Sequence, residues 1–202
     1  MKMKTRDAMK VLAAHRGGSL AVCALGMASN EWWAATKSEE TFYVHGAMGF
    51  AASFALGLAL SLPKEHVLLF NADGSLCMNL GCLLTEAGAA PKNLKHFVVD
   101  NRVYQTVSAV PMVNRNLSDY VGIARAAGIA KAREIDNVAD LERLAPEIMA
   151  SDGPYFVNLR VEAESAHLAV PPNNYEGAEV KFRFGRAVEK RLGIKVFGPQ
   201  GY

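Results

Sequence analysis

The stretch from His66 to Asn101, HVLLFNADGSLCMNLGCLLTEAGAAPKNLKHFVVDN, decides the fold. An apolar run ends in Ala72-Asp73-Gly74-Ser75, a helix-like segment follows, and a second apolar run ends in Asp100-Asn101. Two parallel strands joined by a helix need about this length, so the stretch predicts a βαβ unit. In a right-handed unit the carboxyl ends of both strands lie at one edge of the sheet, where open α/β folds bind ligands.

The polar side chains at this edge predict a pocket for a divalent cation and a phosphate. Asp73 offers a carboxylate and Asn101 an amide oxygen, and hard cations prefer such oxygen ligands. The small residues Gly74 and Ser75 open the helix that follows the first strand. The N-terminus of a helix favours an anion, so a phosphate is expected beside the cation.

The rest of the chain alternates between strand-like and helix-like segments. We expect strands over 19–25, 41–44, 130–135 and 155–161, and helices over 5–16, 119–128, 138–150 and 180–192. Residues 26–30 form a turn into a further helix, with Ser29 as its N-cap, and 102–116 form a loop. The alternation predicts an α/β fold, a doubly wound parallel sheet with helices on both faces. The 202 residues fit a single domain (1–202), with 171–202 as a C-terminal extension.

Composition excludes several classes of function. A net charge of +2 and the absence of a basic stripe with interleaved aromatics give no reason to expect nucleic-acid binding. The three cysteines, Cys23, Cys77 and Cys82, form no CxxC motif, which argues against a disulfide framework and against zinc or iron–sulfur sites. The first ten residues, MKMKTRDAMK, lack the apolar core of a signal peptide, so a cytoplasmic location is expected.

One uncharged segment invites a membrane interpretation. It runs from Gly46 to Pro63, GAMGFAASFALGLALSLP, whereas a membrane span needs roughly 20 predominantly apolar residues. The segment is short and rich in Gly, Ala and Ser, which allow a helix to approach a neighbouring backbone or ligand closely. We therefore predict a buried helix and no membrane association, with a membrane helix as the alternative.

The ends of three predicted strands together carry a family resemblance. These ends are Gly26–Ser29, Gly46–Met48, and Asp73 with Asn101. The pattern Asp73-Gly74-Ser75 followed by Asn101, 28 positions after the aspartate, resembles the GDG…N motif of the thiamine diphosphate-dependent 2-oxoacid decarboxylases. Over roughly residues 5–165 the chain resembles the diphosphate-binding domain of that family. It is most similar to the β subunit of sulfopyruvate decarboxylases and the C-terminal domain of phosphonopyruvate decarboxylases.

The resemblance implies a Mg²⁺ ion as well as thiamine diphosphate. Asp73 would bind the metal through its carboxylate, Asn101 through its side-chain oxygen and Val103 through its backbone carbonyl. Two diphosphate oxygens and a water would complete the octahedron that Mg²⁺ demands. A plain strand-end acid at Asp73 and a mere turn residue at Asn101 are the alternatives.

The resemblance also implies which residues would contact the organic cofactor. Gly74 and Ser75 would bind the diphosphate, with Ser29 on a second phosphate-side loop, and Tyr104 and Thr106 on the loop that supplies a further donor. Three further residues would lie near the two rings of the cofactor. Gly46 would accept a hydrogen bond from the 4′-amino group, and Met48 would pack beneath the bend between the rings. Ala47 lies between these two residues. His45 would be a proton relay, although a structural histidine is the competing interpretation. For Met48 a plain core role competes.

Some positions depart from the family pattern. Ala72 replaces the first glycine of the motif. The position can accept the methyl group of alanine if its φ is negative. Asp100 stands where many relatives have asparagine, and this position need not touch the metal. Val103 is larger than the glycine or alanine that is common there. Residues 105–110 contain no acid, so a catalytic acid of this loop has no counterpart.

The resemblance further implies a missing half of the active site. In the family a glutamate from a separate pyrimidine-binding domain activates the cofactor, and such a domain would need a further ~150–180 residues. We therefore expect a partner (α) subunit that carries this domain and glutamate, in an α2β2 or larger assembly. The apolar 46–62 segment and the tryptophans Trp32 and Trp33 are expected at or near the contact, with a place in the core as the alternative for the tryptophans.

The expected activity is that of a thiamine diphosphate-dependent lyase. The chain would be the diphosphate- and Mg²⁺-binding subunit of an enzyme that decarboxylates a small 2-oxo acid, such as a sulfopyruvate- or phosphonopyruvate-like molecule, to an aldehyde. Carboligase or lyase chemistry on an acyloin and a catalytically silent subunit are the alternatives. A nucleotide-binding or sensor domain of doubly wound type is a third, which does not depend on the resemblance.

Overall fold

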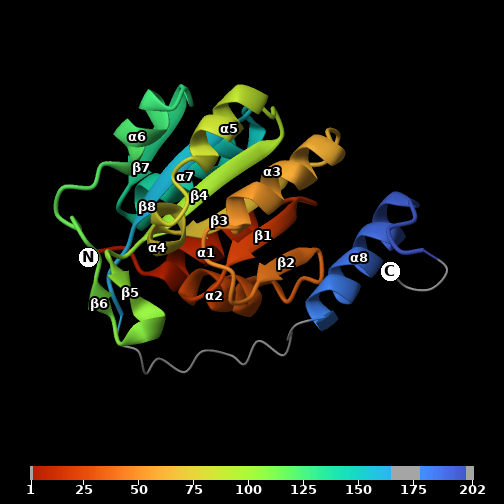
Figure 1. Cartoon of the computed structure of the whole chain (residues 1–202), viewed down its shortest axis with the longest axis horizontal. Coiled ribbons are helices and arrows are strands. Elements are labelled where there is room, and N and C mark those ends of the chain that lie inside the picture. Colours follow the sequence, from red (N-terminus) through yellow and green to blue (C-terminus); the bar gives the residue numbers. More distant parts are fainter. Residues whose placement is uncertain (1, 165–177, 199–202) are drawn as a thin grey trace.

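A single parallel sheet forms the centre of the computed structural model, which describes residues 2–164 and 178–198 (Figure 1). Within these residues the sheet has six strands in the order β2-β1-β3-β4-β8-β7, and every neighbouring pair is parallel. The strands are β1 (Leu20–Ala24), β2 (Thr41–Val44), β3 (Val67–Ala72), β4 (Leu94–Asp100), β7 (Lys131–Ile135) and β8 (Tyr155–Arg160). The predicted parallel sheet is confirmed.

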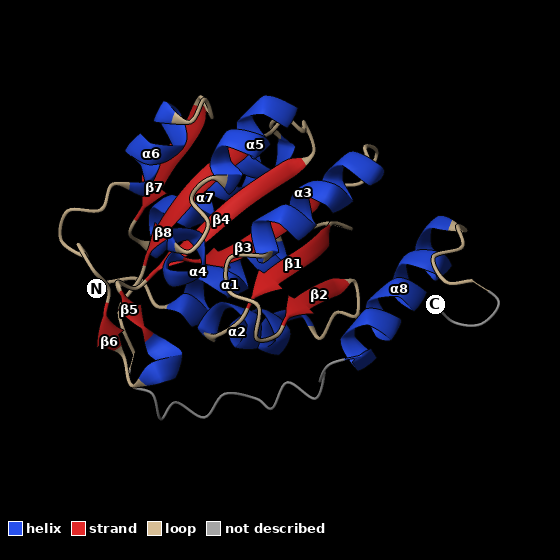
Figure 2. Cartoon of the chain, in the orientation of Figure 1, coloured by secondary structure: helices blue, strands red, loops and turns tan. Residues whose placement is uncertain are grey.

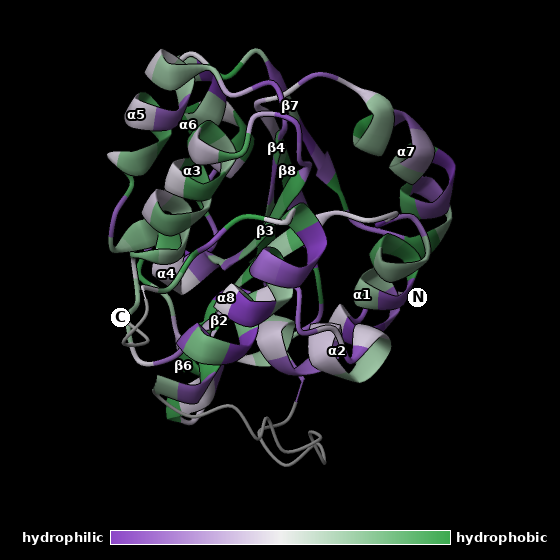
Figure 3. Ribbon diagram, turned by 90° about the vertical axis from the view of Figure 1, so that its right-hand side faces the viewer, coloured by the Kyte–Doolittle hydropathy of each residue, from purple (hydrophilic) through white to green (hydrophobic). Residues whose placement is uncertain are grey.

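Helices cover both faces of this sheet, as Figure 3 shows. One face carries α1 (Thr5–Ala14), α2 (Met27–Thr36) and α7 (Val138–Ala150), and the other carries α3 (Ala51–Ser61), α5 (Cys82–Ala89) and α6 (Tyr120–Ala126). A further helix, α8 (Ala178–Leu192), lies beside the edge strand β2. The predicted doubly wound architecture is thus correct.

The central strands read as continuous apolar runs because both of their faces are buried. Successive side chains of a strand point to opposite faces. In β3, Leu68 and Phe70 join the hydrophobic cluster beneath α1 and α7, whereas Val67 and Leu69 join the cluster beneath α3 and α5. This two-sided burial accounts for the absence of a polar alternation in the sequence.

Two segments have more structure than the sequence predicted (Figure 2). The helical part of the βαβ unit is divided into α4 (Asp73–Cys77) and α5, with a turn between them in which the Asn79 side chain donates to the carbonyl of Gly49 at 3.0 Å. The loop after Asn101 contains an antiparallel hairpin, β5 (Val103–Tyr104) and β6 (Val110–Pro111), joined through the short 3-10 turn Gln105–Val107.

The uncharged segment forms a turn and then α3, an 11-residue helix whose alanines pack on the sheet. None of the helices in the described part of the chain has the length and hydropathy to cross a membrane. Trp32 is fully buried on the opposite face of the sheet, where its Nε1–H donates to Thr41 Oγ1 at 3.0 Å. Of the two places expected for Trp32, the core and a subunit contact, the structure thus confirms the core.

Candidate functional site

The site lies at the carboxyl edge of the sheet, between β1 and β3. The strand order reverses there, because the chain leaves β1 towards β2 on one side and leaves β3 towards β4 on the other. Such a switch point leaves a crevice between the two turns that follow the strands. The cavity found there is lined by the turn after β1, the turn after β3, Met48, and the start of the hairpin. Its lining residues are Leu25, Gly26, Met27, Ala28, Met48, Ala72, Asp73, Gly74, Ser75, Val99, Asn101, Val103, Tyr104, Gln105 and Thr106.

Asp73 is the first residue of α4, and only 2% of it is exposed. Its Oδ1 accepts the backbone N–H of Gly74 at 2.7 Å, and its Oδ2 accepts the backbone N–H of Arg102 at 2.7 Å. Burial raises the pKa of this carboxyl to about 7; the Arg102 N–H opposes the rise and the neighbouring charge of Asp100 adds to it. A carboxylate this poorly solvated favours a cation beside it.

Asp100, the last residue of β4, adds a second buried carboxylate near Asp73. Its Oδ2 accepts a hydrogen bond from Asn158 Nδ2 at 3.0 Å and lies 3.3 Å from the guanidinium of Arg160. Its Oδ1 lies 3.6 Å from Arg102 Nε and has no hydrogen-bond partner among the described residues. Two buried carboxyl groups thus lie close together at this edge, and their negative charge is not fully neutralised. A divalent cation would reduce their repulsion.

Asn101 and Val103 line the same cavity as Asp73. The Asn101 Oδ1 accepts the backbone N–H of Val103 at 3.0 Å, which turns the amide oxygen into the bend that leads to the hairpin. The structure thus brings the three predicted metal ligands together. Nowhere do the described residues gather three or more His, Cys, Asp or Glu side chains into a metal-binding group. One carboxylate with neutral oxygens suits Mg²⁺, which keeps waters and phosphate oxygens among its ligands.

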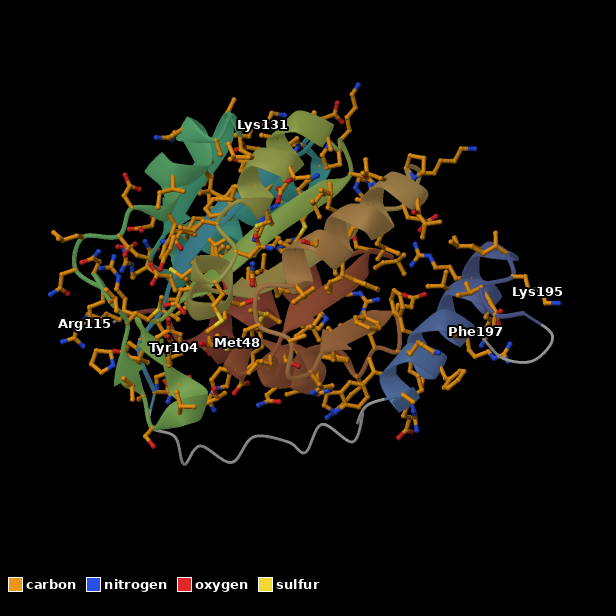
Figure 4. The ribbon with its side chains drawn as sticks, viewed as in Figure 1. Met48, Tyr104, Arg115, Lys131, Lys195 and Phe197 are labelled. Carbon is orange, nitrogen blue, oxygen red and sulfur yellow. The ribbon has the colours of Figure 1, made fainter. Side chains whose placement is uncertain are left out.

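Gly74 and Ser75 form the floor of the cavity. A Cβ on Gly74 would lie 2.7 Å from a ring carbon of Tyr104 and 3.6 Å from Cε of Met48, so only glycine fits beneath these two side chains (Figure 4). The Gly74 N–H donates to Asp73, and the Ser75 hydroxyl oxygen accepts the N–H of Gly49 at 3.1 Å. In this structure the Gly74 amide donates within the turn, and the Ser75 hydroxyl still has a proton to donate. That both residues bind the diphosphate stays a prediction.

Ser29 lies elsewhere than predicted. The helix α2 begins at Met27 with Gly26 as its N-cap, so Ser29 is buried in the first turn and is not the cap. The turn itself contributes to the cavity through Gly26, Met27 and Ala28, because the positive φ of Gly26 (105°) turns the chain there. The methyl group of Thr106 lies 3.6 Å from the position of a Gly26 Cβ, so the hairpin reaches across to this turn.

The remaining predicted residues divide into two groups. Met48, Tyr104 and Thr106 line the cavity, whereas Gly46, Ala47 and His45 lie outside its lining, in the turn before Met48. Gly46 has a positive φ of 67°, which explains a glycine there.

Ala72 has φ −102°, as the replacement of the motif's first glycine requires. Gln105 lines the cavity but was not predicted as a site residue, since an amide in a loop carries no distinctive pattern.

Comparison with known families agrees with a cofactor site at this edge of the sheet. Residues 22–159, well over half of the chain, match the family described as thiamine pyrophosphate enzyme, C-terminal TPP binding domain. A solved structure of a candidate thiamin diphosphate-dependent enzyme from Mycobacterium smegmatis superposes with a TM-score of 0.68 at 18% identity, over 80% of this chain and 32% of that one. The second likeness supports the fold alone.

Two characterised relatives are similar over most of this chain. The sulfopyruvate decarboxylase subunit beta of Methanothermobacter thermautotrophicus is 32% identical over 188 residues, which cover 93% of this chain and 97% of that subunit. The phosphonopyruvate decarboxylase of Streptomyces viridochromogenes is 34% identical over 174 residues, which cover 81% of this chain and 40% of that enzyme. The chain therefore matches one relative end to end and the other over less than half of its length.

Proposed function

The chain belongs to the thiamine pyrophosphate enzymes through their C-terminal cofactor-binding domain, and we propose that it is the Mg²⁺- and diphosphate-binding subunit of a two-subunit decarboxylase. The observation that carries the proposal is the convergence of Asp73, Asn101 and Val103 on one cavity at the switch point of the sheet. The likeness to a separate beta subunit over nearly its whole length supports the two-subunit arrangement.

In this proposal the chain's own residues hold the metal and orient the cofactor. Asp73, Asn101 and the Val103 carbonyl bind Mg²⁺, and the Ser75 hydroxyl donates to the diphosphate. Met48 and Tyr104, which both border Gly74, exclude water from this part of the site. The bound thiamine diphosphate supplies the nucleophilic carbon and the electron sink for loss of carbon dioxide. Gly46, two residues before Met48, would present its carbonyl to the aminopyrimidine of the bound cofactor.

The proposed partner is a pyrimidine-domain subunit that supplies the activating glutamate. Large apolar side chains are exposed on the segment after Met48, on the turn between α4 and α5, on α5 itself, and on the loop that follows β6, where a partner would bury them. The most exposed are Phe50 (67%), Met78 (59%), Leu84 (65%), Val113 (82%) and Leu117 (83%). We infer an α2β2 or larger assembly in which the cofactor lies between the two kinds of subunit.

The proposed substrate is a small 2-oxo acid with a second acidic group, like the sulfopyruvate and phosphonopyruvate in the names of the two relatives. Arg102 and Arg115 line a cleft that shares Asn101 with the site, and Figure 4 shows Arg115 on the same side of the molecule as Tyr104. We propose that these two cations attract such a dianion. Lys92 precedes β4 at the opposite edge of the sheet, away from the site, and lies 3.9 Å from Asp152. Lys92 is therefore too far from the site to bind the acidic group of the substrate.

The test is carbon dioxide release by this chain mixed with its candidate partner, with thiamine diphosphate and Mg²⁺ present. Sulfopyruvate, phosphonopyruvate and pyruvate are compared as substrates. We expect release from a dianionic 2-oxo acid, with an equimolar yield of aldehyde. Acyloin formation or cleavage without carbon dioxide would instead identify a carboligase or lyase. Cofactor binding without turnover of any of these substrates would identify a silent subunit.

A further inference from the structure

Three polar side chains form a connected network directly beneath the metal-binding turn. Asn71 comes from β3, His96 from β4 and Glu86 from α5, and each is at most 1% exposed. His96 pairs in register with Leu69, and Asn71 lies two residues further along the same strand, so both side chains point to the face that α5 covers. The helix places Glu86 above them.

The hydrogen bonds of the network have one self-consistent arrangement. His96 Nδ1 lies 2.9 Å from Glu86 Oε2, and His96 Nε2 lies 3.3 Å from Asn71 Nδ2. An amide nitrogen only donates, so His96 Nε2 accepts and the imidazole proton is on Nδ1, which donates to Glu86. The Asn71 Oδ1 then accepts the backbone N–H of Ala72 at 3.0 Å. If the Asn71 amide were flipped, its Nδ2–H would face the backbone N–H of Ala72, and two donors would oppose each other.

The last hydrogen bond of this series fixes the turn that carries the metal ligand. Ala72 is the N-cap of α4, and Asp73 follows it directly. The first four N–H groups of a helix and its cap otherwise depend on side chains or water. Asn71 thus holds the backbone at the point where β3 ends and the Asp73 carboxylate is aimed into the cavity.

Stability alone does not account for these three residues. Glu86 Oε1 has no hydrogen-bond partner among the described residues, so the buried acid is incompletely compensated. An apolar pair of similar volume at 86 and 96 would avoid the cost of burying a carboxylate that a single imidazole N–H compensates only in part. Orientation of a metal ligand through a hydrogen-bonded outer shell is the use that fits the geometry.

We propose that Asn71, oriented by His96 and Glu86, is a positioning residue for the Mg²⁺ ligand Asp73. The inference rests on the proposed function, since it concerns the same metal. It goes further in assigning a role to a buried network that touches neither metal nor cofactor. Loss of the network is expected to weaken Mg²⁺ binding about tenfold, the lower end of the effect of outer-shell partners on metal sites.

The experiment measures the dissociation constant of Mg²⁺ at saturating thiamine diphosphate, using this chain with its candidate partner. Asn71→Ala removes the last hydrogen bond and leaves the His96–Glu86 pair intact. The double variant Glu86→Leu/His96→Leu removes the pair without leaving an unpaired buried charge. Glu86→Gln keeps an acceptor for His96 Nδ1–H and should behave as wild type. Leu83→Val, a core change on the same helix, controls for a general loss of stability.

The expected result is a rise of about tenfold in the Mg²⁺ dissociation constant for Asn71→Ala and for the double variant, with kcat at saturating Mg²⁺ within about twofold of wild type. Glu86→Gln and Leu83→Val should leave Mg²⁺ binding unchanged. Wild-type Mg²⁺ affinity in both network variants would overturn the inference alone. A wild-type protein that binds no Mg²⁺ would overturn the proposed function, and the inference with it.

Discussion

The backbone N–H of Arg102 donates to the Oδ2 of Asp73 at 2.7 Å, and this hydrogen bond ties the end of β4 to the end of β3. Arg102 has a positive φ of 64°, so the chain turns back sharply just after Asn101. The turn brings Asn101 and Val103 to the cavity that Asp73 lines. The proposed metal ligands are therefore arranged before any metal binds, which lowers the cost of binding.

Asp73 should make Mg²⁺ binding and stability depend on pH in opposite directions. Burial raises the pKa of its carboxyl to about 7. Between these pKa values the folded chain binds a proton that the unfolded chain has released, so the contribution of Asp73 to metal-free stability is highest below pH 4 and falls as pH rises towards 7. A metal must displace that proton, so Mg²⁺ affinity should rise about tenfold per pH unit up to pH 7 and then level off.

The matched variant for this prediction is Asp73→Asn. It removes the buried charge, so it should stabilise the metal-free chain at pH 8 by an amount on the order of 4 kcal/mol, and have little effect at pH 3.5. Mg²⁺ with thiamine diphosphate should raise the melting temperature of the wild type and not that of the variant. Equal melting temperatures of the metal-free wild type and variant at pH 8 would contradict the raised pKa.

Gly74→Ala should damage the site through Tyr104. The added Cβ would lie 2.7 Å from the aromatic ring, so the ring and the hairpin that carries it must move. We expect a loss of about 1–3 kcal/mol in stability and at least tenfold weaker binding of thiamine diphosphate. Gly57→Ala on α3, where an added Cβ meets nothing within 4 Å, is the control and should stabilise by roughly 0.5–1 kcal/mol. Calorimetric cofactor titration and thermal melting measure both effects.

Lys95→Met should stabilise the chain at neutral pH. The Lys95 Nζ is buried with no hydrogen-bond partner among the described residues, and burial lowers the pKa of the amine to about 8. After a discount for solvent screening, folding at pH 7 carries a cost on the order of 2 kcal/mol, which diminishes as pH rises from 8 to 10.5. A melting temperature roughly 5–10 °C higher for the variant is expected at pH 7, and a smaller gain at pH 10. Lys92→Met, at an exposed lysine, is the control and should leave the melting temperature unchanged at both pH values.

Phe50 and Met78 should contribute to binding of the partner subunit. Both flank Gly49 beside Met48 and are mostly exposed in the isolated chain. Phe50→Ser and Met78→Ser should each weaken association with the candidate partner about tenfold or more, because buried aromatic and sulfur side chains dominate such interfaces. The Ile194→Ser variant, at an exposed apolar residue that follows α8, is the control. Sedimentation velocity on mixtures of the two chains distinguishes the outcomes.

Much of the fold could be predicted from the sequence because two-sided burial leaves a clear mark. Apolar runs that end in Gly, Asp or Asn marked the strands and the edge at which they end. The division between α4 and α5 was not predicted, because it depends on a hydrogen bond from Asn79 to Gly49, a contact distant in sequence. The extent of the single domain, 171–202 as an extension, and the cytoplasmic location stay predictions.

For the candidate site, the residues next to a motif were easier to place than those that support it. Asp73, Asn101 and Val103 follow strand ends, and the structure gathers them as expected. Ser29 was misplaced as an N-cap because Gly26 caps the helix through its own backbone freedom. His96 looks like an exception inside an apolar strand, and its role becomes visible only when α5 brings Glu86 over it.

The most direct test of the central claim is calorimetric titration of thiamine diphosphate with Mg²⁺ into this chain, alone and mixed with its candidate partner. The wild-type mixture should bind the cofactor only when Mg²⁺ is present, more tightly than the chain alone, and Asp73→Ala should lose at least a hundredfold in affinity, about 2.7 kcal/mol or more. Absence of binding in the mixture, or binding that Asp73→Ala leaves unchanged, would contradict the claim that this chain is the metal–diphosphate half of a thiamine diphosphate site.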